Sequence, residues 1–390
     1  MKIKYYESKP VWELEKSDKY LYEKLILKDN EILKTLENHN LKNSIPFFEN
    51  INFFESNEYI RPNGSNRAFY IKLKSGGVLA IKGSEVLSNQ IENKMKEDAT
   101  NQIGSRPWTT YENFIYREQK PPLVLNVKEA EEDQLRSYEF QKRILKKFGD
   151  FETAPIPLFT YNLPNKITKN YLNVIKPYLN DRAIEIIENP LMKNGLGVAI
   201  YYYEHIPFRI QFESINKNIP ISQRLKNAAK DQLKPYKAFN SIDKLLFIVS
   251  KMLTSNLMPL SRQAHGIGQC IAKQNVTLLG GIADMGSIID FKEINSEAEF
   301  IQLFYSCISV LTSTVKEFLT RGNTSFLYEF EDPTPLSIMI SSYCLQRINF
   351  YCNDLKKNHN LEVSSFLNSC LDNCNSFSSE KLENTLHKLY

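Results

Sequence analysis

Residues 265–290 read HGIGQCIAKQNVTLLGGIADMGSIID, and this stretch decides how the chain is interpreted. Residues 276–279 are β-prone and Gly280-Gly281 supplies a tight turn, so a short β-hairpin is predicted. Asn275 and Asp284 stand at its two ends. Amide and carboxylate oxygens suit Mg²⁺, which usually binds through one or two protein groups together with nucleotide phosphates. The stretch therefore predicts a Mg²⁺ or Mn²⁺ site at Asn275 and Asp284.

The same residue types have a second interpretation. Asn, Asp and Gly occur wherever a chain reverses direction, so the hairpin also fits a plain turn in an unrelated α+β protein. The residues of the hairpin leave both interpretations open.

Length and composition indicate a globular protein with a sizeable core. The chain has 390 residues, of which 42% are hydrophobic and 24% charged, and this fits one two-lobed unit or two domains. The net charge is +4 and the lysines are spread along the chain, so no nucleic-acid partner is expected. No apolar run approaches the length of a membrane span, and the N-terminal sequence MKIKYYESKPVWELEK is too charged for a secretory signal. We therefore expect a soluble, cytoplasmic protein without a membrane span.

The six cysteines all lie in the C-terminal part of the chain, at positions 270, 307, 344, 352, 370 and 374. None belongs to a Cys-x-x-Cys pair, and Cys370 and Cys374 lack the two further close ligands that a zinc site needs. Reduced and mostly buried thiols are expected.

Patterning along the chain predicts an α+β fold, with a β-rich part followed by a mainly helical part. Residues 1–60 carry apolar residues at three- and four-residue steps and are predicted to form a helical N-terminal prefix. Residues 61–206 are predicted to be β-rich, with an irregular insertion at 88–120 and a strand at 197–203 before a linker. Residues 207–390 are predicted to be mainly helical and to carry the metal hairpin. The helices expected there are 226–233, 242–257, 297–320, 335–356 and 361–388.

A second hairpin is predicted at residues 68–81. It turns at Gly76-Gly77, where the missing Cβ lets backbone amides approach a phosphate, and Lys82 ends its second strand. An ordinary hairpin turn is the alternative for this glycine pair.

A third apolar run, at residues 123–127, is predicted to be a buried strand that ends in Lys128. We favour Lys128 as the phosphate-binding lysine, because the helix that follows carries Glu139, which could hold the ammonium group toward the phosphates. Lys82 stays the alternative, since the interval from Lys128 to Glu139 is short.

The metal hairpin resembles a stretch of the selenoprotein O pseudokinases, which have a protein-kinase-like fold. In that family an Asp-Asn pair is followed, after an apolar stretch and a glycine, by an Asp-aromatic-Gly turn, and NVTLLGGIADMG at 275–286 has the same Asn-to-Asp interval. The segments 205–213 and 138–158 are similar more loosely, so the resemblance covers residues 65–300 in patches. It implies a bilobal kinase-like fold, ATP and Mg²⁺ as cofactors, and a catalytic loop that opens at His265-Gly266.

The sequence departs from this family where a general base is expected. Gln274 stands in place of the Asp before Asn275, and Cys270 holds the position of the kinase Asp. Loss of a general base typically lowers a rate by about 10²–10⁴-fold. Phosphoryl-type transfer relies chiefly on positioning and electrostatic stabilisation, so metal and nucleotide binding can survive this loss.

The sequence thus predicts an ATP- and metal-dependent transferase that moves AMP or phosphate onto a protein or peptide acceptor. The resemblance implies AMP transfer, whereas ordinary kinase chemistry implies phosphate transfer. Two alternatives are an ATP-dependent enzyme that activates a carboxylate, which suits Gln274, and a catalytically silent pseudokinase that serves as a binding module. The candidate catalytic residues are Lys128, Glu139, His265 and Gln274, and the candidate nucleotide-binding residues are Gly76, Gly77, Lys82 and Lys128.

Overall fold

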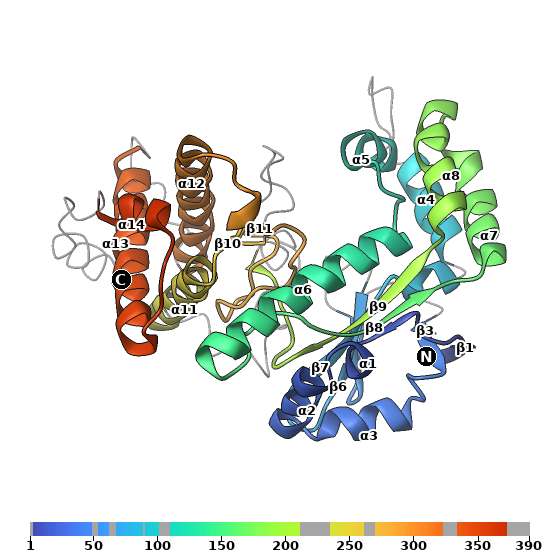
Figure 1. The fold of residues 1–390 in the computed structure, drawn as a ribbon. Coiled ribbons are helices and arrows are strands. Elements are labelled where there is room, and N and C mark those ends of the chain that lie inside the picture. Colours follow the sequence, from blue (N-terminus) through green and yellow to red (C-terminus); the bar gives the residue numbers. More distant parts are fainter. Residues whose placement is uncertain are drawn as a thin grey trace. The chain divides into compact units, whose positions relative to one another are not determined.

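The computed structural model describes residues 3–48, 54–61, 68–88, 90–100, 110–210, 235–260, 270–322 and 334–372 (Figure 1). The fold is α+β, as predicted, with a large antiparallel sheet and many helices. The predicted helix at 226–233 and the candidate residue His265 lie outside the described residues.

The chain divides into two compact units. Unit 1 consists of Met1–Leu135 and Ile156–Ile206, and unit 2 consists of Arg136–Pro155 and Pro207–Tyr390. The long helix α6 (Val127–Phe148) contributes residues to both units.

Unit 1 is built on a seven-stranded antiparallel sheet in the order β2-β8-β9-β7-β6-β5-β4. Strands β7 (VLAIK) and β9 (GVAIYYY) are buried along their whole length, because each lies in the middle of the sheet and reads as a continuous apolar run. Gln134 of α6 donates its amide to the carbonyl oxygens of Phe159 and Ile200, which holds the helix on β8 and β9. The strands are β2 (Trp12–Glu13), β4 (Phe54–Glu55), β5 (Tyr59–Arg61), β6 (Ala68–Lys72), β7 (Val78–Lys82), β8 (Ile156–Asn162) and β9 (Gly197–Tyr203).

The first 60 residues contain strands as well as helices, so the prediction of a purely helical prefix was incomplete. Strand β1 (Ile3–Glu7) pairs antiparallel with β3 (Ser44–Phe48) in a separate two-stranded sheet. Three helices lie between these strands in sequence, and Asp18 caps the second by accepting a hydrogen bond from the Leu21 amide. The helices are α1 (Leu14–Ser17), α2 (Lys19–Lys28) and α3 (Glu31–Asn38).

The predicted irregular insertion at 88–120 contains regular helices in its described part. Helices α4 and α5 pack against α7 and α8 in one helical group of unit 1. The Asn180 side chain caps α8 by accepting from the Ala183 amide, and its backbone amide donates to Glu112 of α5. These elements are η1 (Ser84–Leu87), α4 (Ile91–Thr100), α5 (Thr110–Glu118), α7 (Asn165–Ile175), η2 (Lys176–Tyr178) and α8 (Asp181–Asn194).

The predicted buried strand that ends in Lys128 is wrong. Helix α6 begins at Val127, so Lys128 lies in its first turn. The physical reason is Asn126, whose side-chain oxygen accepts from the Glu129 amide at 2.7 Å and whose carbonyl accepts from the Ala130 amide at 3.0 Å. An asparagine at this position starts a helix, and this cap outweighs the β preference of the apolar residues before it.

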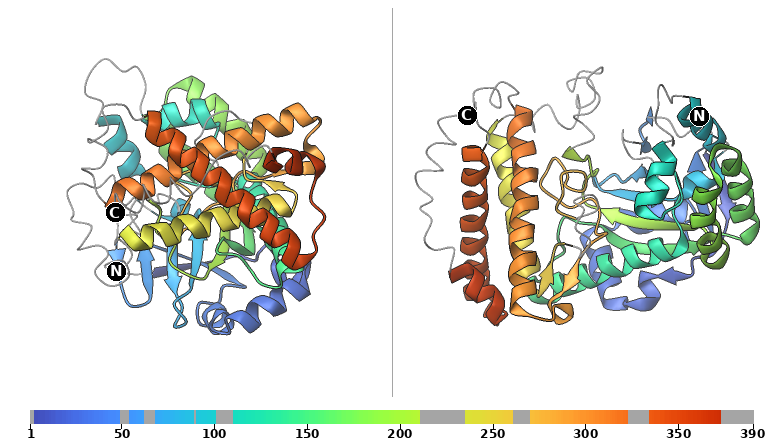
Figure 2. Two further views of the ribbon diagram at one scale, coloured as in Figure 1. Left: turned by 90° about the vertical axis from the view of Figure 1, so that its left-hand side faces the viewer. Right: turned by 90° about the horizontal axis from the view of Figure 1, so that it is seen from above.

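The core of unit 2 is formed by three long helices, which lie side by side (Figures 1 and 2). Helix α11 buries Leu245, Val249 and Met252 at helical spacing, as its sequence predicted. The five cysteines in the described residues are buried free thiols, which agrees with their prediction. The elements are α11 (Pro235–Thr254), β10 (Leu257–Met258), β11 (Ile289–Asp290), η3 (Phe291–Glu293), α12 (Glu297–Gly322), α13 (Thr334–His359) and α14 (Ser365–Asp372).

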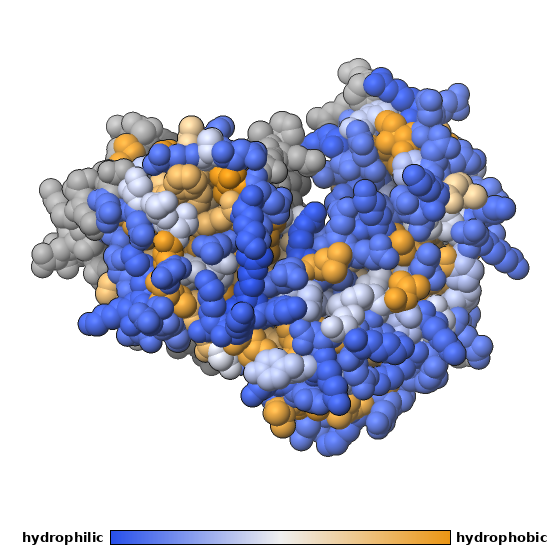
Figure 3. All heavy atoms as spheres, in the orientation of Figure 1, coloured by the Kyte–Doolittle hydropathy of each residue, from blue (hydrophilic) through white to orange (hydrophobic). Residues whose placement is uncertain are grey.

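Helix α12 is relevant to the prediction that the chain has no membrane span, because it is long and apolar. Its segment Glu297–Phe318 is the one helix among the described residues that is long and apolar enough to cross a membrane. Half of that segment is buried by the rest of the protein, which is typical of a core helix and makes it a weak membrane candidate. Figure 3 shows mainly hydrophilic side chains on the face drawn, with smaller apolar areas between them.

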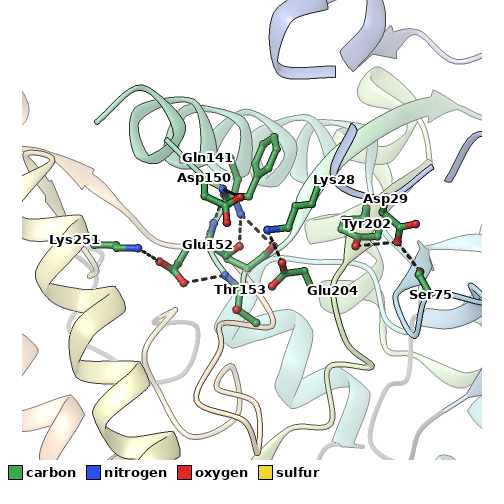
Figure 4. A network of polar contacts seen from close by, with 12 residues as sticks. Lys28, Asp29, Ser75, Gln141, Asp150, Glu152, Thr153, Tyr202, Glu204 and Lys251 are labelled. Carbon is green, nitrogen blue, oxygen red and sulfur yellow. Dashed lines mark hydrogen bonds and ion pairs between the residues drawn. The ribbon is translucent and has the colours of Figure 1, made fainter. Parts of the chain in front are cut away.

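Buried carboxylates in both units have polar partners, some of which are drawn in Figure 4. In unit 1, Asp29 accepts hydrogen bonds from the Ser75 and Tyr202 hydroxyls at 2.6 and 3.1 Å. In unit 2, Glu152 accepts from the Lys251 ammonium group at 2.7 Å. Burying a charge without a partner is costly, so these contacts offset the cost of burying the two carboxylates.

Candidate functional site

The predicted hairpin of unit 2 is present. Val276 and Ile282 form an antiparallel bridge, and the Thr277 amide donates to the Gly281 carbonyl at 2.8 Å. At its open end the Ala283 amide donates to the Asn275 carbonyl at 2.7 Å. The hairpin therefore places Asn275 beside the start of the Asp284-Met285-Gly286 turn.

The closed end of this hairpin is packed too tightly for any side chain at its glycines. A Cβ atom on Gly280 would lie 2.0 Å from the Ser241 carbonyl oxygen, and one on Gly281 would lie 2.6 Å from the Thr153 side chain. Gly280 also has φ +77°, a conformation that favours glycine. The Ser241 hydroxyl donates to the Leu278 carbonyl at 2.8 Å, which fixes the turn against the start of α11.

The side chains of Asn275 and Asp284 face the same positive charge. The guanidinium group of Arg209 lies 3.4 Å from Asn275 Oδ1 through Nη1 and 3.6 Å from Asp284 Oδ2 through Nη2. Asn275 is buried, and the Asp284 side chain is 24% exposed, so an ion from solvent could reach the carboxylate. Two oxygen atoms of the types that Mg²⁺ prefers are thus directed at one cationic group.

Arg209 is held beside the hairpin by its own backbone. It forms an antiparallel bridge with Thr277, and the hydrogen bonds Ile210 N to Val276 O and Leu278 N to Phe208 O flank it at 3.0 and 2.8 Å. Because the backbone already joins the two segments, the guanidinium group is not needed to hold them together.

The chain after Asp284 is also fixed at several points. Arg136 of α6 donates to the Gly286 carbonyl at 2.6 Å, and the Ser287 hydroxyl accepts from the Cys270 amide at 3.1 Å. Farther along, Arg143 of α6 pairs with Asp290. These contacts restrict the backbone on which the Asp284 carboxylate is carried.

Cys270 lies five residues before Asn275, the spacing at which the sequence comparison with kinases predicted a general base. Its thiol is fully buried and lies 3.5 Å from the Pro259 carbonyl oxygen. Burial first, and the Asp284 carboxylate second, raise the pKa of this thiol far above its usual range. Cys270 is therefore neutral at physiological pH and cannot act as a base.

The remaining predicted residues of this region add little geometry. Gln274 is half-buried in the turn that precedes the hairpin. No group of three or more His, Cys, Asp or Glu side chains that could hold a metal ion occurs in the described ranges. A metal at Asn275 and Asp284 would need the rest of its ligands from phosphate oxygens or water.

In unit 1, Lys82 lies at the open end of the β6–β7 hairpin, where it pairs with Ala68. Lys82 is only 8% exposed, and its ammonium group lies 4.7 Å from the centre of the Tyr201 ring. A lysine over an aromatic face gains cation–π attraction that partly offsets its desolvation. The sheet thus positions a largely buried positive charge at the end of a central strand.

The predicted glycine turn is at the opposite end of this hairpin from Lys82. Gly77 precedes the first residue of β7 and Lys82 is the last, so they are separated by about 17 Å at the usual rise of a strand. A Cβ atom on Gly77 would lie 2.9 Å from the Tyr202 ring and 3.0 Å from the Tyr203 carbonyl oxygen. Close packing against β9 accounts for Gly77, and the two glycines cannot act on the same phosphate as Lys82.

Lys128 and Glu139 are not brought together. Lys128 is 69% exposed and lies 3.8 Å from Glu132, whereas Glu139 is 52% exposed and lies 3.9 Å from Arg143. Both carboxylates belong to exposed pairs within one helix, which contribute little to stability.

Sequence reasoning did not identify Arg209 or Arg136 as site residues. Arg209 lies 66 positions before Asn275. The segment 205–213, HIPFRIQFE, contains it, but its residue types alone do not indicate that it reaches the hairpin.

Neither a protein-family model nor a curated protein nor a solved structure matches the chain.

Proposed function

We propose that the protein is an ATP- and metal-dependent transferase of kinase-like fold, which moves AMP or phosphate onto a protein or peptide acceptor. One observation carries the proposal: Asn275 Oδ1 and Asp284 Oδ2 are held at the ends of one hairpin and face a common positive charge, the Arg209 guanidinium group. A plain turn does not require this convergence.

Charge gives this arrangement a chemical use. Mg²⁺ or Mn²⁺ at Asn275 and Asp284 would neutralise the negative charge that develops on a transferring phosphorus group. Arg209 would then lose its carboxylate partner and could contact a phosphate oxygen, for which a guanidinium group is well suited. In this proposal the two oxygen atoms contact Arg209 when no metal is bound, and they bind the metal when it is present.

Unit 1 supports the proposal through Lys82. Kinases carry their phosphate lysine at the end of a V-A-I-K strand that precedes a long helix, and β7 reads VLAIK with α6 farther along the chain. We assign the phosphate contact to Lys82 rather than to Lys128, because Lys82 is buried at a strand end and Lys128 is exposed on a helix. The strand order β5-β6-β7-β9-β8 is compatible with a kinase-like sheet.

Two further functions are kept as alternatives because of Cys270. A buried neutral thiol in the place of the general base suits an enzyme that activates a carboxylate, since a carboxylate needs no deprotonation at neutral pH. It also suits a silent pseudokinase that binds nucleotide. For all three functions we propose a cytoplasmic protein without a membrane span.

The proposal is tested by thermal denaturation with ATP, first with Mg²⁺ and then with EDTA. A ligand at 100 times its Kd stabilises a protein by about 2.7 kcal/mol. We expect stabilisation only with the metal, and we expect Asp284→Asn to abolish it. Asp290→Asn is the matched control, because Asp290 is a nearby carboxylate that pairs with Arg143. Equal stabilisation in EDTA would contradict the metal pair.

Mass spectrometry then separates the three functions. The protein is incubated with ATP and Mg²⁺, alone and with added proteins. A mass increment of AMP or of phosphate on a protein supports the transferase and shows which group moves. Pyrophosphate release that depends on an added carboxylate supports the second function, and binding without turnover supports the pseudokinase.

A further inference from the structure

A polar cluster in unit 1, away from the residues assigned to nucleotide, joins four side chains. The Tyr5 hydroxyl lies 2.7 Å from His39 Nδ1, and His39 Nε2 lies 3.1 Å from Glu58 Oε1. The Tyr59 hydroxyl lies 3.4 Å from the same His39 Nδ1. These residues come from β1, the end of α3, the β4–β5 turn and β5, so the fold gathers them from distant parts of the sequence.

The partners of His39 determine its tautomer. An ionised Glu58 carboxylate only accepts hydrogen bonds, so His39 Nε2 carries the hydrogen and donates it to Glu58. Nδ1 of the neutral ring is then an acceptor, and the Tyr5 hydroxyl donates to it. Glu58 therefore orients a histidine whose Nδ1 lone pair faces the Tyr5 phenol.

Burial differs between the members of the cluster. His39 is only 5% exposed, whereas Tyr5 is 46% exposed. The planes of the Tyr5 ring and the imidazole differ by 25° with centroids 6.3 Å apart, and Tyr59 packs edge-on against the imidazole at 5.7 Å. The hydroxyl of a partly exposed tyrosine is thus held against a buried base, while Tyr59 is only 8% exposed.

We propose that Tyr5 is an activated acceptor hydroxyl for acyl transfer, with His39 as its general base and Glu58 as the residue that orients His39. Nucleophile, base and orienting carboxylate in hydrogen-bonded series are the arrangement that activates hydroxyl groups for attack on carbonyl carbon. In the reaction Tyr5 Oη forms a bond to the acyl carbon, and the bond from that carbon to the leaving group breaks. The leaving group takes the electron pair, and the Tyr5 proton passes to His39 Nδ1 and on to the leaving group.

Charge favours an acyl donor over a polyphosphate donor. The charged side chain that contacts His39 is the Glu58 carboxylate, which repels a highly anionic reagent. This site therefore does not depend on the nucleotide chemistry proposed above.

Of the pKa shifts in the cluster, that of His39 fits its role as the base. Burial raises the pKa of Tyr5 and Tyr59, so both phenols are neutral and need a base. Burial lowers the pKa of His39 from its ordinary value, although Glu58 opposes this shift. His39 is consequently unprotonated at neutral pH, and the reactivity of Tyr5 should fall when the pH drops through the His39 pKa.

A structural role alone does not require this geometry. Strand β1 is already paired with β3 over five residues, from Ile3 opposite Phe48 to Glu7 opposite Ser44. A test must therefore measure the reactivity of the hydroxyl rather than the stability of the fold.

The experiment treats the full chain with N-acetylimidazole and follows acetylation of each tyrosine by peptide mass spectrometry. Tyr20 is the internal control, because it is 62% exposed and lies over Lys24 rather than beside a histidine. We expect Tyr5 to react at least about tenfold faster than Tyr20 at pH 7.5, which is a modest share of the usual effect of a general base. Below the His39 pKa this ratio should fall toward one.

Two variants keep the inference open to contradiction. His39→Asn removes the base, and the Tyr5-to-Tyr20 ratio should fall to about one, as expected when general-base help is lost. Because His39 is buried and its variant could fail to fold, Glu58→Gln is the second variant. Glu58 is 56% exposed, and its replacement should lower the ratio without affecting Tyr20, since only the orienting charge is lost. A Tyr5 rate equal to that of Tyr20, or a Tyr5 rate unchanged in Glu58→Gln and independent of pH, would overturn the proposal.

Discussion

Each unit contains a β-hairpin that turns at a pair of glycines. From the sequence, the first pair was predicted to contact a phosphate and the second to form only a tight turn. The β6–β7 hairpin of unit 1 turns at Gly76-Gly77 and ends at Lys82, whereas the hairpin of unit 2 turns at Gly280-Gly281 and ends at Asn275 and Asp284. Gly77, Gly280 and Gly281 lie against other parts of the protein, whereas Gly76 has open space around it. The residues with chemical potential stand at the open ends.

This comparison teaches what a glycine pair indicates. Glycine permits close approach of any backbone, whether the approaching group is a phosphate or another segment of the protein. In the β6–β7 turn the approaching groups are Tyr202 and Tyr203, and in the other turn they are Ser241 and Thr153. Packing against β9 thus accounts for Gly77, whereas no neighbouring group explains Gly76.

The largest effect is expected from Gly280→Ala. The new Cβ atom would lie 2.0 Å from the Ser241 carbonyl oxygen at φ +77°, so the backbone must move. Overpacking of this kind costs about 1–3 kcal/mol and left-handed backbone about 1–2 kcal/mol more, so we expect about 2–5 kcal/mol of destabilisation. Urea denaturation followed by circular dichroism measures this change.

Gly149→Ala is the matched control for Gly280→Ala. Gly149 also lies in unit 2, with φ +80°, but a Cβ atom there meets nothing within 4 Å. Its replacement should cost only the backbone strain of about 1–2 kcal/mol. Equal costs at both positions would mean that the clash with Ser241 relaxes freely, and that close packing at Gly280 does not fix the unit 2 hairpin.

A smaller effect is expected from Gly77→Ala. Its Cβ atom would lie 2.9 Å from the Tyr202 ring, which can shift slightly, and 3.0 Å from the Tyr203 carbonyl, which cannot. We expect about 1–3 kcal/mol of destabilisation in urea denaturation, because the turn is overpacked. The increase in stability that ATP and Mg²⁺ give should be the same in this variant as in the original protein.

Gly76→Ala sharpens the same test. Gly76 has φ +96° and open space around it, so only strain of about 1–2 kcal/mol is expected. A selective loss of ATP binding in this variant would restore the phosphate role that the sequence suggested for the turn.

The parts of the molecule that the sequence predicted correctly are those determined by neighbours in the chain. The unit 2 hairpin follows from a β-prone run and a glycine pair, and α11 follows from apolar residues at helical spacing. Both patterns lie within a few residues of the element they specify.

The failures have equally definite causes. Residues 123–127 are apolar enough for a strand, but Asn126 caps a helix instead. Lys128 therefore lies in the first turn of α6 and not at the end of a strand. Arg209 was not assigned a role because its contact with Asn275 spans 66 positions, and such a contact depends on tertiary packing. His265 lies outside the described residues, so its predicted role stays a prediction.

The smallest effect is expected from Lys128→Met, which compares the helix lysine with the lysine at the open end of the β6–β7 hairpin. Lys128 is 69% exposed, and its contact with Glu132 is a surface pair within one helix. Such pairs contribute about 0.3–0.5 kcal/mol, so the free energy of unfolding should change by no more than this. Stabilisation by ATP and Mg²⁺ should stay the same.

Lys82→Met is the matched variant, because methionine keeps the length of the side chain over the Tyr201 ring while removing the charge. In the proposed function this variant should lose most of the ATP-dependent stabilisation and keep a folded sheet. If Lys128→Met lost that stabilisation and Lys82→Met kept it, the phosphate contact would belong to the first turn of α6, and the likeness between the open ends of the two hairpins would carry no functional meaning.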